Sequence, residues 1–105
     1  MSFRKRRTQT QLTAPGTTAH IEMSKMRGVK YFSLVCATLN TSVTVRVENT
    51  NGTSVVSQGI DQVISTNGTF NIPVFPASSH VRLNFVSEVG GTAATITPTY
   101  NEELV

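Results

Sequence analysis

The sequence is poor in the residues that build catalytic and metal sites. It contains no tryptophan, two histidines and one cysteine, and charged residues make up 14% of its 105 positions. A single cysteine excludes a disulfide within the chain, so we expect a reducing compartment. Cys36 lies in an apolar stretch, which predicts a buried and unreactive thiol. No His-x-His, Cys-x-x-Cys or Asp-x-Asp spacing occurs, so we predict neither a metal nor a cofactor.

Long apolar runs are missing as well. No stretch approaches the ~20 apolar residues of a membrane helix. The basic N-terminus leads into polar residues rather than into the apolar core of a signal peptide. We therefore expect a protein that is made in the cytoplasm, is not secreted and does not contact a membrane. The Asn-x-Ser/Thr triplets that begin at Asn40, Asn51 and Asn67 are interpreted as turn residues and not as glycosylation sites.

The body of the chain alternates as β-strands do. In residues 42–48, Val43, Val45 and Val47 share one side, and the polar residues between them share the other, which predicts a strand with one wet face. Further strands are predicted at 19–23, 29–38, 53–58, 61–65, 69–75, 80–87 and 92–100, and no helical period extends beyond a turn. These elements indicate an all-β protein with a single antiparallel β-sandwich. Jelly-roll and immunoglobulin-like topologies both remain open.

Two Asn-Gly pairs, at 51–52 and 67–68, predict two-residue type I′ hairpin turns. The first would join the strand at 42–49 to that at 53–58. The second would join 61–65 to 69–75. Pro73 has no backbone N–H to donate, so the strand that contains it is expected at an edge or a bulge.

The first 18 residues lack any such period. Arg4–Arg7 contain four of the nine basic residues, whereas the acidic tail contributes −2 and the rest only +1 to the net charge of +3. We therefore divide the chain into an extended basic arm (1–18), a β-sandwich (19–101) and an acidic tail (102–105). The arm is expected to bind an acidic partner surface, with cations and two apolar anchors as its contacts: Phe3, Arg4, Lys5, Arg6, Arg7 and Leu12.

Other interpretations of the basic cluster are a solvated tail and a nucleic-acid contact. Four charges would make a weak and salt-dependent nucleic-acid site, and the nearly neutral body argues against it. Glu102 and Glu103 are opposite in sign to the arm, which suggests a head-to-tail contact between copies of the chain.

Nothing in the sequence indicates an enzyme. Ser79, His80 and Asp61 could form a triad on paper, but no serine lies in a Gly-x-Ser-x-Gly elbow. Gly90-Gly91 precedes no helix that would bind a phosphate. We therefore predict no catalytic residues and no small-molecule substrate.

The last predicted hairpin, residues 79–97 (SHVRLNFVSEVGGTAATIT), resembles the closing hairpin of small β-sandwich proteins of tailed-bacteriophage particles. There, a Val-Arg-Leu-Asn-Phe type of strand precedes a Gly-Gly turn and a threonine-rich strand. The strand SVTVRVE at 42–48 is similar in style. The resemblance implies a homo-oligomeric structural protein of the virion, a capsid decoration or cement protein, whose partner is a capsid or other virion protein.

Similar strands occur in carbohydrate-binding sandwich modules, so the alternative function is a glycan-binding or receptor-binding β-sandwich module of a tail or fibre. Sugars stack on exposed aromatic rings, and Tyr31 and Tyr100 are the only tyrosines here. This scarcity favours the capsid interpretation.

Overall fold

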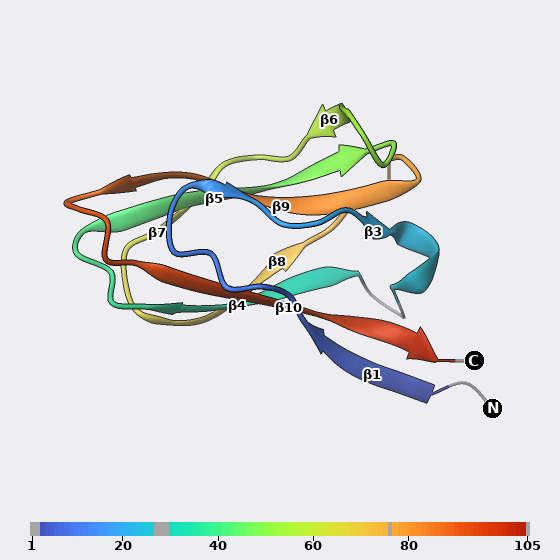
Figure 1. Ribbon diagram of the computed structural model, residues 1–105, viewed down its shortest axis with the longest axis horizontal. Coiled ribbons are helices and arrows are strands. Elements are labelled where there is room, and N and C mark those ends of the chain that lie inside the picture. The colour runs from blue at the N-terminus through green and yellow to red at the C-terminus, as the bar shows by residue number, and fades with distance from the viewer. Residues whose placement is uncertain (1–2, 27–29, 76, 105) are drawn as a thin grey trace.

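The computed structural model describes residues 3–26, 30–75 and 77–104, and of residues 3–5 and 102–104 the backbone only. It contains ten strands and one short 3-10 helix, and two antiparallel sheets face each other (Figure 1). The elements are β1 (Phe3–Thr8), β2 (Gly16–Thr17), β3 (Ile21–Glu22), η1 (Met23–Lys25), β4 (Tyr31–Ala37), β5 (Ser42–Thr50), β6 (Val55–Gln58), β7 (Gln62–Ile64), β8 (Gly68–Pro73), β9 (His80–Val89) and β10 (Thr95–Leu104).

The strand order is that of a jelly roll. Sheet A has the order β1-β10-β4-β8, and sheet B has the order β2-β9-β5-β6, with β3 also paired to β9 and β7 to β5. The first half of the chain therefore pairs with the second half in reverse: β1 with β10, β2 and β3 with β9, β4 with β8, and β5 with β6 and β7. Rolling up this long antiparallel ribbon brings β10 beside β4 and β9 beside β5. The predicted sandwich is confirmed, and its topology is the jelly-roll alternative.

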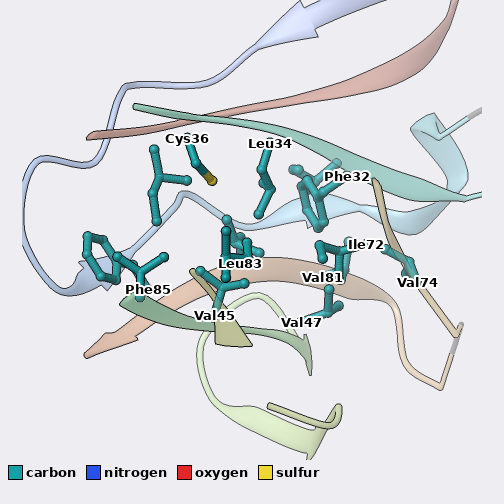
Figure 2. Close-up of a cluster of buried hydrophobic side chains, with 14 of the residues drawn as sticks. Phe32, Leu34, Cys36, Val45, Val47, Ile72, Val74, Val81, Leu83 and Phe85 are labelled. Carbon is teal, nitrogen blue, oxygen red and sulfur yellow. The ribbon is translucent and has the colours of Figure 1, made fainter. Parts of the chain in front are cut away.

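The core lies between the sheets and comes from the alternating apolar positions. Figure 2 shows Phe32 and Leu34 of β4 directed toward Leu83 and Phe85 of β9. All four side chains are fully buried. Cys36 is also buried, and burial raises the pKa of its thiol to about 11. The prediction of a buried thiol is confirmed, and the thiol stays protonated at neutral pH.

The predicted Asn-Gly turns are wrong in type. β5 and β6 do form a hairpin, but Thr50 pairs with Val55, so the loop has four residues. Asn51 caps this loop by accepting the backbone N–H groups of Thr53 and Ser54 at 2.9 and 2.8 Å. Among the described residues other than glycine, only Thr38 has a positive φ, so Asn51 lacks the conformation of a type I′ turn.

The second predicted hairpin does not exist. β7 pairs with β5 in sheet B and β8 pairs with β4 in sheet A, so the chain crosses between the sheets at this point. Asn67 instead accepts the backbone N–H of Leu39 through its side chain, at 3.0 Å. β8 is the outermost strand of sheet A, which confirms the edge position predicted from Pro73.

Candidate interaction site

The basic N-terminal segment is a strand of the jelly roll. β1 pairs along its whole length with the end of β10, from Phe3 opposite Leu104 to Thr8 opposite Thr99. β2 pairs with β9 in the other sheet. The described part of this segment, from residue 3 on, therefore differs from the expected free arm, because the C-terminal strand of the same chain supplies pairing that we assigned to a partner.

The register of β1 and β10 sets opposite charges across from each other. Arg4 pairs with Glu103, and Lys5 pairs with Glu102. Opposite charges at directly facing positions of an antiparallel pair stabilise it by about 0.2–1 kcal/mol each. The register thus sets the arm and the tail of one chain beside each other, and the contact between copies at Glu102 and Glu103 stays a prediction.

Arg6 and Arg7 are exposed residues within β1, opposite Asn101 and Tyr100 of β10. Arg6 donates through Nη1 to Asn101 Oδ1 at 3.2 Å and to Tyr31 Oη at 3.4 Å. Asn101 donates through Nδ2 to the same tyrosine oxygen at 3.3 Å. These contacts tie three neighbouring strands together on the outer face of sheet A, and the guanidinium of Arg6 remains exposed.

Leu12, expected as an apolar anchor on a partner, packs instead against the core of its own chain. Its backbone exchanges two hydrogen bonds with Ile96, at 2.8 and 2.9 Å. The side chain of Phe3, the other expected anchor, and those of Arg4 and Lys5 lie outside the described residues, as do the side chains of Glu102 and Glu103. The candidate site is therefore defined by the backbone of β1 and by the basic character of its sequence.

The outer edge of β1 is open. Gln9 donates its backbone N–H to Pro98 O at 2.9 Å, so residue 9 faces β10. Backbone groups alternate in direction along an antiparallel strand. Those of Arg4, Arg6 and Thr8 consequently point away from β10, and no other strand in the described part of the chain pairs with β1 on that side. An open edge of this kind accepts an additional strand.

The opposite flank of the sandwich carries an apolar groove of about 250 Å³ between β8 and the β6–β7 segment. Its buried lining residues are Val47, Asn49 and Ile72. Ile60 and Phe75 also line it and are 83% and 76% exposed. The alternation pattern did not predict this groove, because its residues come from several strands and loops that only the fold brings together.

A buried carboxylate lies on the outer face of sheet B. Glu48, which is 2% exposed, accepts hydrogen bonds from Arg82 Nε at 2.8 Å, Asn84 Nδ2 at 3.0 Å and Arg46 Nε at 3.1 Å. Burial alone would raise the pKa of Glu48, but these three hydrogen bonds and the charge of Arg82 together hold it below its ordinary value. The sequence pattern predicted that Glu48 lies on the solvent-exposed face of its strand, and for this residue the prediction is wrong.

Ser79, His80 and Asp61 do not form a catalytic triad in the structure. Ser79 Oγ lies 2.8 Å from His80 Nδ1, but Asp61 forms an ion pair with Arg46 at 3.4 Å. Within the residues that the structure describes, no group of three His, Cys, Asp or Glu side chains is placed to hold a metal ion. The only helix among them is the single turn η1, which is too short to cross a membrane.

Comparison of the chain with protein-family models, with curated proteins and with solved structures gave no match.

Proposed function

We propose that this protein is a structural subunit of a tailed-bacteriophage virion, a capsid decoration or cement subunit that attaches to a neighbouring virion protein through the open edge of β1. The observation that carries the proposal is the combination of outward-facing backbone groups at Arg4, Arg6 and Thr8 with four consecutive cations. The resemblance of the closing hairpin to phage proteins supplies the class of particle.

The edge suits an extended acidic segment of the partner. Such a segment would add to sheet A by backbone hydrogen bonds, which is a common mode of peptide recognition. Successive side chains of a strand point to opposite faces, so Arg4–Arg7 would present cations on both faces of the new pair. The same cations repel the β1 edge of a second copy, which disfavours unspecific edge-to-edge association.

The mechanism would be mechanical. Each copy would bind weakly through one strand edge, but a symmetric array on a shell turns many weak contacts into strong attachment. Separating neighbouring shell subunits would then require breaking the added strands as well. Jelly rolls occur among viral capsid domains, which is compatible with this role, although the fold alone does not assign a function.

The copy number in particles gives the first test. Quantitative mass spectrometry of particles purified from the virus that encodes the chain should find tens to hundreds of copies, as expected from shell symmetry. About a dozen or fewer would move the protein to the tail or connector. Complete absence would refute the virion proposal.

Binding of variants to shells that lack the protein tests the edge itself. Proline at Thr8 removes an outward N–H and leaves the β1–β10 ladder intact, so Thr8→Pro should weaken shell binding by about tenfold or more. Thr8→Ala is the matched control, because it keeps the N–H and should bind as the unaltered protein does. Equal binding by both variants would contradict attachment through this edge.

A further inference from the structure

A second concave site is lined by residues of β3 and η1, among others. Figure 1 shows η1 at one end of the sandwich. It is a pocket of about 350 Å³, a volume within the range of small-molecule sites. Five separate parts of the chain meet there: the residue after β1, the β3–η1 segment, the β5–β6 loop, the start of β9, and β10. The polar and aromatic side chains that line it are Gln9, His20, Glu22, Lys25, His80 and Tyr100.

The two imidazole rings of the pocket are held in fixed positions. His20 Nδ1 lies 2.7 Å from the hydroxyl of the buried Thr50, which also accepts the backbone N–H of Gly52 at 3.3 Å. The Thr50 hydroxyl both donates and accepts, so it pairs with His20 Nδ1 in either tautomer of the ring. His80 Nδ1 lies 2.8 Å from Ser79 Oγ, and the backbone of Gly52 packs on the His80 ring, where a Cβ would come within 3.4 Å.

Tyr100 gives the pocket an aromatic wall. Its ring meets the fully buried ring of Phe32 edge-on, with 6.4 Å between centroids and 75° between planes. This contact fixes the tyrosine ring while part of it stays exposed. A fixed ring loses little conformational entropy when a flat ligand packs against it.

The rim is polar and has no net charge. Lys25 Nζ lies 4.0 Å from Glu22 Oε2, and the side chains of Glu22 and Lys25 are 54% and 59% exposed. The carboxylate offers acceptors and the ammonium offers donors. On the inner wall Gln9 donates through Nε2 to Ala19 O at 3.4 Å, whereas its enclosed Oε1 receives no hydrogen bond from the described residues.

We propose that this pocket is a binding site for a neutral saccharide. Sugar hydroxyls donate and accept at once, which suits the mixed set of Glu22, Lys25, His20 and His80. The apolar C–H face of a sugar ring suits Tyr100. The balanced rim charge favours a neutral ligand over an anion such as a phosphate. This inference is independent of the β1 edge, because the pocket and the edge use different residues.

The experiment is an array of neutral oligosaccharides followed by titration of the best binder into the isotope-labelled full chain. Saturable binding should shift the amide signals of Gly52, His80 and Tyr100 in NMR spectra. The double variant Glu22→Ala/Lys25→Ala keeps the net charge and alters two exposed side chains, so it should fold and bind about tenfold more weakly. Asp61→Ala is the control: this residue is similarly exposed, lies outside the pocket and should leave binding unchanged.

Three outcomes would overturn the proposal. They are the absence of saturable binding to any neutral saccharide, unchanged affinity in the double variant, and binding of inorganic phosphate in place of sugars. Thr8→Pro should keep the full saccharide affinity. Loss of shell binding and loss of sugar binding would therefore be separate results.

Discussion

Replacing Glu48 by glutamine tests whether the buried carboxylate is held by its charge rather than by its shape. The carboxylate accepts from two guanidinium groups and one amide. Glutamine has nearly the same volume, but one oxygen becomes an NH₂ group that cannot accept. At least one of the three donors would then face another donor, and Arg82 and Arg46 would lose their shared counter-charge.

The expected loss in the free energy of unfolding follows from the burial of Glu48 and its two arginine partners. Removing one partner from a buried ion pair destabilises a protein by about 3–5 kcal/mol. Here Arg46 and Arg82 retain 22% and 20% of their side-chain exposure, and Asp61 still pairs with Arg46. We therefore expect a loss near the lower end, about 3 kcal/mol, which is a large part of the ~5–15 kcal/mol that stabilises a typical domain.

Urea unfolding at pH 7 measures this loss. Glu22→Gln is the matched control: it makes the same chemical change in an exposed ion pair, and we expect a cost below about 0.5 kcal/mol. A loss under about 1 kcal/mol for Glu48→Gln would refute the reasoning, since it would mean that the charge contributes little.

The pH dependence of the stability difference between the unaltered protein and Glu48→Gln gives an independent check. The pKa of Glu48 in the folded protein lies below the ordinary value of 4.5. The stabilisation is therefore fully present above about pH 4.5 and is lost as the pH falls through the lower, folded-state pKa. The gap between the unaltered protein and Glu48→Gln should shrink in acid, and a gap that stays constant down to pH 3 would contradict a charge-based role.

Two further predictions concern the Gly-Gly turn and the acidic end of β10. Gly90 has a φ of +91°, and a Cβ there would lie 2.5 Å from Thr41 Oγ1, so Gly90→Ala should cost about 2 kcal/mol or more and lower the Tm by about 10 °C. Adding Thr41→Gly should restore part of this loss, and no restoration would argue against the clash. Reversing the charge at Glu102 and Glu103 should lower the free energy of unfolding by about 1 kcal/mol, because lysines would then occupy the register positions opposite Arg4 and Lys5. Sedimentation in parallel should show unchanged self-association, and weakened association at unchanged stability would instead place the contact between copies.

The fold class was predictable because alternation alone reports which residues face a core. The clean period at Val43, Val45 and Val47 corresponds to a buried row of β5. The same pattern misjudged Glu48, since it assumes that every residue on the outer face is wet. Whether an outer position is covered depends on the long side chains around it, here Arg46 on the same strand and Arg82 on the neighbouring β9, and the local sequence does not reveal the pairing of β5 with β9.

Pairing between distant segments was the part that sequence patterns did not reveal. Arg4–Arg7 have neither apolar period nor strand propensity, so their strand exists only because the end of β10 lies beside it. The Asn-Gly pairs misled for a related reason: a short motif indicates a turn but not the sheet to which the next strand returns. The polar pocket likewise combines side chains from segments up to 91 residues apart, between Gln9 and Tyr100.

The position of β10 between β1 and β4 has a consequence for the order of folding. Until β10 docks on β4, β1 has no neighbour in sheet A, and the contact that places it joins opposite ends of the chain. Closing so long a loop is entropically expensive and slow, so β1 should be the last strand to be added and the first to be released. A kinetic intermediate without β1 would expose the β1 side of β10 to any extended segment nearby. Competition for that edge, between the chain's own first strand and a foreign one, would then occur each time the protein folds.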